Sequence, residues 1–306
     1  MTSPQPASDP TRVLRLLLML VILVGAGWWA LRHQQVETPP ELLQAQQALQ
    51  AKDLNRAVAA FDKALKAHAN QPLTYLQIMQ ICAAEKRWDL CAAYGDRAIQ
   101  TCRYASKEER ALLYATLSSA YAHIEVAPHQ PSALFAIQRA WELQPQDPDY
   151  ENAYGYLLAD NNRDLDNALA LITVALKTIR ASNDPAVQAE ECAVEDSYGW
   201  ALHRKQRDTE AIVALLQALQ DVPEGAPGDL MKVIYYHLGA AYHGVGKTED
   251  ARNALKSALV YDPDYTEAKA ELASLPAAPP PSPAVPANPP VKNASPSVAS
   301  PASHTP

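Results

Sequence analysis

Apolar and small residues recur along this chain with the period of a helix, and one short pattern returns several times. Each copy places a glycine among apolar and aromatic residues, at Gly155, Gly199 and Gly239, which are 44 and 40 residues apart. An alanine-rich stretch follows each glycine. Residues three or four apart share one face of a helix, so each copy predicts two successive helices. A chain that repeats a helix pair is predicted to be a solenoid, whose long surface suits the binding of other macromolecules.

The clearest copy of this pattern lies in residues 232–265. Gly246 is placed to end a first helix in a left-handed turn, and Pro263 is placed to stop a second. Small residues at the predicted crossing let the two helices approach closely, and large residues fill the space around it. The residues that carry the pattern are Tyr235, Leu238, Gly239 and Tyr242 in the first helix and Ala251, Leu255 and Ala258 in the second.

This pattern resembles the tetratricopeptide repeat (TPR), which has large residues at positions 4, 7, 11 and 24, small ones at 8, 20 and 27, and proline at 32. The resemblance implies an all-α, right-handed superhelical solenoid of about six helix-turn-helix repeats over 41–264, with a capping helix over 265–276. The first two repeats match less well, because Gly95 stands where the second should have a large residue. The matching segments are 41–71, 72–105, 111–147, 148–182, 192–225 and 232–265.

A charge-free apolar run from Leu16 to Leu31 precedes the repeats. Its length is near the lower end for a membrane-spanning helix, and Trp28 and Trp29 stand where interfacial aromatics are expected. A cleaved signal peptide is the alternative, with Gly25-Ala26-Gly27 as its cleavage site. Because the apolar run continues past that site, we expect an uncleaved transmembrane anchor over 12–33, between a disordered tail (1–11) and a linker (34–40).

The charges around this run predict its orientation. Arg12 and Arg15 precede it, whereas Arg32 follows it with acidic residues beyond. This bias favours a cytoplasmic N-terminus and an array outside the cytoplasm. The resemblance points the same way, because signal-anchored TPR proteins are common in bacterial inner membranes with their repeats in the periplasm. An array facing the cytoplasm stays open as the alternative.

The C-terminal segment and the overall charge limit the classes of partner. Residues 276–306 hold eleven prolines and one charged residue, Lys292, so a disordered tail is expected over 277–306. The net charge of the chain is −8, and no basic stripe is present. We therefore expect no binding to nucleic acid. The sequence leaves the oligomeric state unknown.

Four cysteines, Cys82, Cys91, Cys102 and Cys192, carry the only redox signal. Cys82 near the end of one helix and Cys91 near the start of its partner can meet across the turn. A Cys82–Cys91 disulfide is therefore possible if the repeats are periplasmic. The residues favour the other interpretation, in which the thiols pack as small apolar side chains.

No motif predicts a catalytic, cofactor-binding or metal-binding site. His203 and His243 occupy equivalent positions of adjacent repeats, and surface or groove histidines are commoner than a metal pair. The scattered acidic residues fit a solvated exterior. The sequence thus predicts recognition of a partner, with no enzymatic turnover.

The resemblance also indicates where a protein or peptide partner would bind. In TPR arrays, positions 2, 5, 9 and 12 of each first helix line the concave groove. Aromatic anchors with polar neighbours are typical of peptide-binding surfaces. Packing of Trp200 and Tyr236 against the next repeat is the competing interpretation. The predicted groove residues are Asn152, Tyr156, Asp196, Trp200, His203, Tyr236 and His243.

Overall fold

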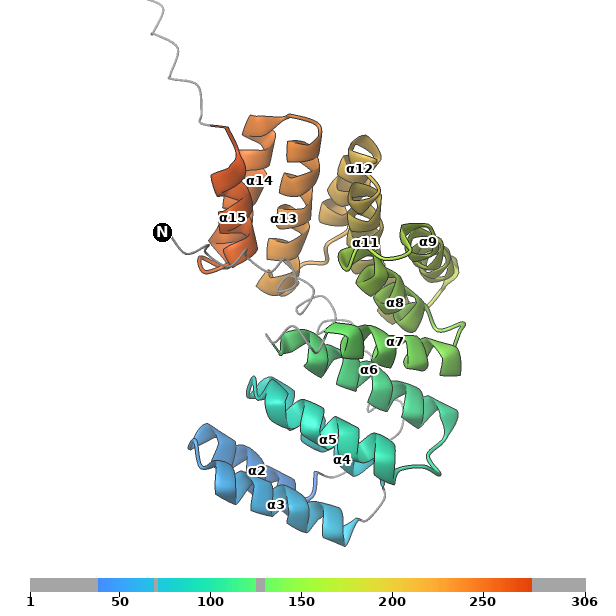
Figure 1. The fold of residues 1–306 in the computed structure, drawn as a ribbon, viewed down its shortest axis with the longest axis vertical. Helices are drawn as coiled ribbons and strands as arrows, with labels where there is room; N and C mark the ends of the chain where they lie inside the picture. Colours follow the sequence, from blue (N-terminus) through green and yellow to red (C-terminus); the bar gives the residue numbers. More distant parts are fainter. Residues whose placement is uncertain (1–37, 69–70, 125–129, 277–306) are drawn as a thin grey trace, which may run out of the picture. The chain divides into compact units, whose positions relative to one another are not determined.

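The computed structural model describes residues 38–68, 71–124 and 130–276. Over these ranges the chain forms helices and no strands, which confirms the all-α prediction. Helix pairs follow one another and a single helix ends the array (Figure 1). The pairs are α2 (Pro40–Gln50) with α3 (Leu54–Ala67), α4 (Pro72–Ala84) with α5 (Trp88–Thr101), α6 (Lys107–His123) with α7 (Gln130–Leu143), α8 (Pro148–Asp160) with α9 (Leu165–Ala181), α11 (Glu191–Arg204) with α12 (Asp208–Gln220), and α13 (Gly228–Gly244) with α14 (Thr248–Tyr261), followed by α15 (Thr266–Ser274).

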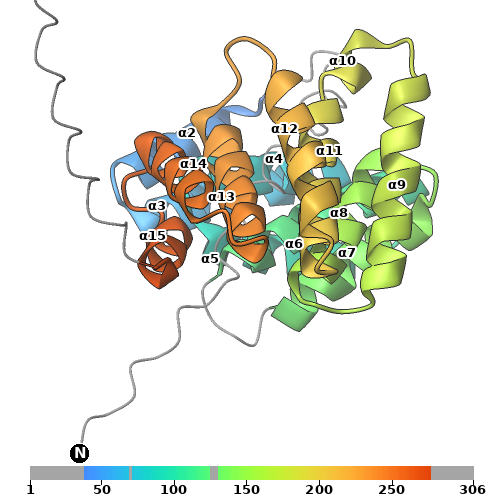
Figure 2. The same cartoon turned by 90° about the horizontal axis from the view of Figure 1, so that it is seen from above.

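The predicted anchor (12–33) and the proline-rich tail (277–306) lie outside the described residues. No helix in the described ranges combines the length and apolar character that crossing a bilayer requires. The connection between the fourth and fifth pairs contains one extra turn of helix, α10 (Pro185–Gln188), between the end of α9 and the start of α11 (Figure 2).

The turns inside most pairs share one hydrogen-bonding pattern. After α13, Gly246 has a φ of 74°, and the amide of Lys247 donates to the carbonyl oxygen of Tyr242 at 2.9 Å. This closes the helix in the left-handed turn that the sequence predicts. The turns after α2, α4, α8 and α11 repeat the pattern without glycine, with positive φ at Lys52, Lys86, Asn162 and Gln206. Lys52, Lys86 and Gln206 each cost about 1–2 kcal/mol of backbone strain, whereas asparagine adopts this conformation more readily.

Small residues hold the paired helices in close contact. A Cβ atom added to Gly239 would lie 2.6 Å from Leu255 Cγ, and one added to Gly199 would lie 2.6 Å from Leu215 Cγ. In the third pair Ser118 takes the same place, and its hydroxyl donates to the carbonyl oxygen of Ala133 at 2.8 Å. Position 8 is therefore small because a large side chain of the partner helix fills that space.

The second pair reverses this arrangement. Met79 stands at the small position of α4, and Gly95 stands at the large position of α5. A Cβ on Gly95 would lie 2.8 Å from the terminal methyl group of Met79, which is fully buried. The side chain that fills the crossing therefore comes from the first helix, and the total volume is retained.

We predict that Gly155→Ala destabilises the protein by about 1–3 kcal/mol through overpacking, although alanine favours helix by about 1 kcal/mol. The added Cβ would lie 2.8 Å from the backbone carbonyl oxygen of Ala168, which cannot rotate away. Urea unfolding followed by circular dichroism measures the change. Gly228→Ala is the matched control, because its nearest atom lies 3.4 Å away. Equal midpoints for the two variants would contradict the packing account.

Candidate functional site

The predicted groove residues lie together on three first helices. Helix α11 contacts both α8 and α13, so the faces that carry these residues adjoin one another. Most of the side chains are buried: Trp200 is 3% exposed and Tyr236 is 8% exposed. His203 and His243 are partly exposed, with 22% and 35% of their side chains accessible. Packing between repeats accounts for the buried members, and binding of a partner by this face stays a prediction.

An aromatic cluster fills the space between these helices. We define it as Tyr156 on α8, Trp200 on α11, Tyr236 and His237 on α13, and Tyr265 just before α15. The rings of Trp200 and His237 stack with centroids 4.2 Å apart, and those of Tyr236 and Tyr265 meet edge to face at 5.5 Å. His237 and Tyr265 were missed at the sequence level, because neither occupies a groove position of the repeat.

Carboxylates from neighbouring helices hold the cluster in place. Trp200 Nε1 donates to Asp160 Oδ1 at 3.2 Å, and His237 Nδ1 lies 2.9 Å from Asp196 Oδ1, with His237 and Asp196 fully buried. At the rim, His203 Nδ1 lies 2.6 Å from Asp208, and His243 Nδ1 lies 2.5 Å from Glu271. Each of these three histidines thus pairs with an acidic residue on a helix other than its own.

Several polar atoms of this face are buried without a hydrogen-bond partner. They are Asn152 Oδ1, Tyr156 Oη, His237 Nε2 and Tyr265 Oη. Burial raises the pKa of Tyr156 and of Tyr265, so both hydroxyls keep their protons at neutral pH and remain donors. Buried polar atoms in folded proteins are nearly always satisfied by protein, water or ligand. These atoms lie inside the packed face, among the rings of the aromatic cluster.

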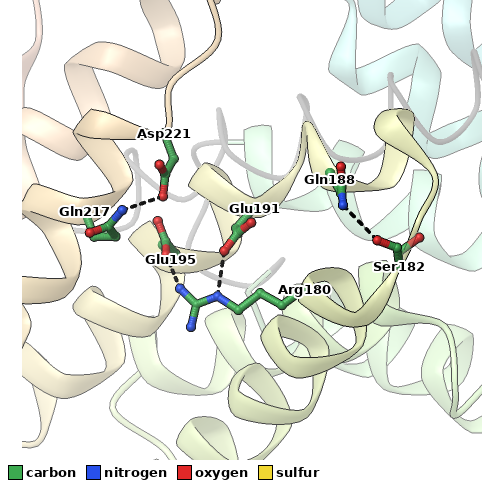
Figure 3. A network of polar contacts seen from close by, with 7 residues as sticks. All are labelled: Arg180, Ser182, Gln188, Glu191, Glu195, Gln217 and Asp221. Carbon is green, nitrogen blue, oxygen red and sulfur yellow. Dashed lines mark hydrogen bonds and ion pairs between the residues drawn. The ribbon is translucent and has the colours of Figure 1, made fainter.

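A second polar site lies on a different side of α11 from the aromatic cluster. Helix α11 contacts both α9 and α12 there (Figure 2). Glu191, Glu195 and Asp221 form an acidic triad whose nearest oxygens all lie within 4.8 Å of one another (Figure 3). Arg180 of α9 donates to Glu191 Oε1 at 2.6 Å and also to Glu195 Oε1. Glu195 and Arg180 also line a cavity of about 420 Å³ between α9, α11 and α12.

The sequence alone did not identify this triad. Two signals were available: Glu191 and Glu195 are four residues apart and share a helix face, and Glu195 stands at position 4 of its repeat, where the pattern has a large residue. Asp221 comes from the residue after α12, and only the fold brings it near. Burial raises the pKa of Glu195 to about 7, helped by the negative charge of Asp221 and opposed by Arg180.

The cysteines of the second repeat are buried free thiols. Burial raises the pKa of Cys82 to about 12 and raises that of Cys91 further. The Cys82–Cys91 disulfide and the packing of these thiols as small apolar side chains both stay predictions. Cys91 occupies the small position 20 of its repeat, where it is 1% exposed.

Several solved structures are similar to this chain. Human IFIT1, solved as a dimer with m7Gppp-AAAA, matches 88% of this chain and 64% of its own length at 16% identity, with a TM-score of 0.53. YrrB, described as a TPR protein with an unusual peptide-binding site, matches 69% of this chain and 96% of its own length at 18% identity, with a TM-score of 0.43. A TPR protein from Parabacteroides merdae covers 76% of this chain and 96% of its own length, with 11% identity and a TM-score of 0.45.

No protein-family model and no curated protein matches the sequence. Identities this low establish the fold alone, and they transfer no ligand to this chain. The packing within the helix pairs supports the TPR pattern independently of these comparisons, because small residues contact large ones at the positions that the pattern assigns.

We predict that Glu195 makes the protein less stable as the pH rises. Its pKa is raised from an ordinary value of 4.5 to about 7 in the folded state, so the folded protein binds this proton more tightly than the unfolded chain. Its contribution to stability is therefore present below about pH 4.5 and lost by about pH 7. Arg180, Glu191, Glu210 and Asp221 are the charged groups around it.

The test compares Glu195→Gln with wild type by urea unfolding at several pH values. The variant should be the more stable protein at pH 8, and the difference should shrink as the pH falls to 4.5. Other carboxyl groups whose pKa is raised, such as Asp149 beside Glu190, are present in both proteins, so their effect on stability cancels in this comparison. A stability difference between Glu195→Gln and wild type that does not change with pH would contradict the raised pKa of Glu195.

Proposed function

We propose that this chain is a protein-binding TPR scaffold that is anchored in a membrane. Its partner would bind along the first helices of the last three repeats, beside the aromatic cluster. The mechanism is recognition, and the proposed role is assembly of a cell-envelope complex or chaperone-like holding of a partner. The observation that carries the proposal is the pair of partly exposed histidines, His203 and His243, at the rim of the aromatic cluster.

The partly exposed rim supports a peptide or protein as the partner. His203 and His243 stand at equivalent positions of adjacent repeats, each held by a carboxylate that fixes its ring. Side chains held in this way lose little entropy when a partner binds. Buried aromatic rings beneath them supply a rigid floor of the kind that interfaces use as anchors.

The charges of this face favour a protein partner over a nucleic acid. Asp160 and Asp196 lie within the aromatic cluster, and Glu267 and Glu271 lie beside it on α15. Carboxylates repel phosphate groups, and binding to nucleic acid depends mainly on basic side chains that contact phosphates. The oligonucleotide in IFIT1 therefore gives no reason to propose the same ligand here, although the folds are alike.

The membrane part of the proposal depends on the run from Leu16 to Leu31 and its flanking arginines. An anchor would confine the array to a layer beside the membrane and raise its effective concentration for membrane-bound partners. We propose the inner membrane as the location, with a cytoplasmic N-terminus and an extracytoplasmic array. An accessory subunit of an envelope enzyme complex would use the same face and anchor.

We predict that a photo-crosslinking residue at His203 or His243 captures one discrete protein species in intact membranes. The same residue at Lys256, exposed on α14, is the matched control and should capture none of that species. Electrophoresis followed by mass spectrometry identifies the product. Capture of the same species from all three positions, or of none from the two rim positions, would refute binding at this face.

We predict that a reporter fused after Leu275 in the full chain reports an extracytoplasmic location. A fusion to alkaline phosphatase, which is active only outside the cytoplasm, should show phosphatase activity. A fusion to green fluorescent protein should show no fluorescence, because that protein is exported unfolded. The opposite pattern would favour the alternative of a cytoplasm-facing regulator. The crosslinking experiment at the rim is measured separately from the reporter fusion. The predicted topology and the predicted partner binding are therefore tested independently.

A further inference from the structure

We propose that the array bends at one place, the junction between α7 and α8, which acts as a hinge between two halves. The N-terminal half comprises α2–α7, and the C-terminal half comprises α8–α15. The hinge follows from which helices pack together at each junction between repeats, and it is independent of the proposed scaffold function.

At the other junctions, the next helix packs against both helices of the preceding pair. Helix α4 packs against α2 and α3, α6 against α4 and α5, α11 against α8 and α9, and α13 against α11 and α12. The terminal helix α15 likewise packs against both α13 and α14. Packing along two separate lines fixes the orientation of one repeat relative to the next.

The junction at α8 is the exception within the part of the chain that the structure describes. Helix α8 packs against α7, but it makes little or no contact with α6. Figure 1 shows that the helix direction changes around this point, because the helices up to α7 run across the long axis of the array and those from α11 onward run along it. Packing along a single line leaves rotation about that line weakly opposed, which is the geometry of a hinge.

The sequence explains why α6 does not bridge to α8. In the C-terminal half, large side chains at groove positions join successive first helices, and the rings of Trp200 on α11 and Tyr236 on α13 lie 5.9 Å apart. At positions 5, 9 and 12 of its repeat, α6 carries Ala115, Ser119 and Ala122. Neighbouring helix axes are separated by about 8–10 Å, which side chains this small do not span. Helix α6 therefore offers no comparable bridge at these positions.

The packing that remains between α7 and α8 keeps the two halves together. It includes the rings of Trp141 on α7 and Tyr154 on α8, whose centroids are 5.4 Å apart. The chain passes from α7 to α8 in a tight turn, in which the amide of Asp147 donates to the carbonyl oxygen of Gln144 at 3.2 Å. A tight turn and a ring contact can act as a pivot, so the junction bends without coming apart.

The hinge separates the candidate binding face from the predicted anchor. The aromatic cluster and both rim histidines belong to the C-terminal half, with His203 on α11 and His243 on α13. The predicted anchor precedes the N-terminal half in the sequence. Bending would therefore move the partner-binding face relative to the membrane, and this consequence alone rests on the proposed function.

The experiment measures distances between pairs of nitroxide labels in the full chain, purified in detergent, by double electron–electron resonance. Each label is attached to an unnatural ketone-bearing residue, so the native cysteines stay in place. The junction pair is Gln100 on α5 with Lys177 on α9, two repeats apart. The matched control pair is Lys177 with Lys256 on α14, which is also two repeats apart but does not cross the junction. All three positions are exposed.

We predict that the distance distribution of the junction pair is at least about twice as wide as that of the control pair. Trp141→Ala removes the ring contact, so it should widen the junction distribution further and leave the control distribution unchanged. Circular dichroism checks that this variant folds, and Trp141→Phe takes its place if it does not.

The hinge is overturned if the two distributions of the wild-type protein are equally wide, or if the Trp141 variant widens both alike. The crosslinking experiment at the rim uses neither label pair. A rigid junction and a failure of partner binding are therefore told apart.

Discussion

The close crossing of the two helices in each pair is the constraint on which the rest of the structure depends. At Gly155, Gly199 and Gly239 the first helix has no side chain, so a leucine or isoleucine of the second helix lies against its backbone. That contact fixes how far each first helix is rotated about its own axis. Because the rotation is fixed, successive first helices turn equivalent faces toward one another, and Tyr156, Trp200 and Tyr236 meet.

Much of this arrangement follows from the sequence, because it depends on residues close together along the chain. The spacing of small and large residues predicted six helix pairs and the terminal helix, and Gly246 predicted its turn. The second pair shows the limit of that reasoning. Gly95 breaks the pattern when each position is judged alone, but Met79 opposite supplies the missing volume. The left-handed turns at Lys86 and Gln206 carry no comparable sequence signal, because neither lysine nor glutamine favours a positive φ.

The sites were less predictable, because burial in a solenoid depends on contacts between repeats. The groove residues were identified by position, and the fold does bring them together. Their burial comes from the contacts of α11 with α8 and α13, which a single repeat does not contain. The scattered acidic residues were expected on a solvated exterior and Asp196 was expected in the groove, yet Glu195 and Asp196 are both buried. Neither carboxylate can be assigned a partner without knowing which helices surround α11.

Helix α11 connects the two candidate sites. Glu195 and Asp196 are adjacent, so their side chains point about 100° apart around the helix. Glu195 faces Arg180 of α9, and Asp196 faces His237 of α13. A shift of α11 that relieves the repulsion between Glu195 and Asp221 would also move Asp196 and Trp200 against the aromatic cluster. Helix α11 is therefore the element through which charge at one site is felt at the other.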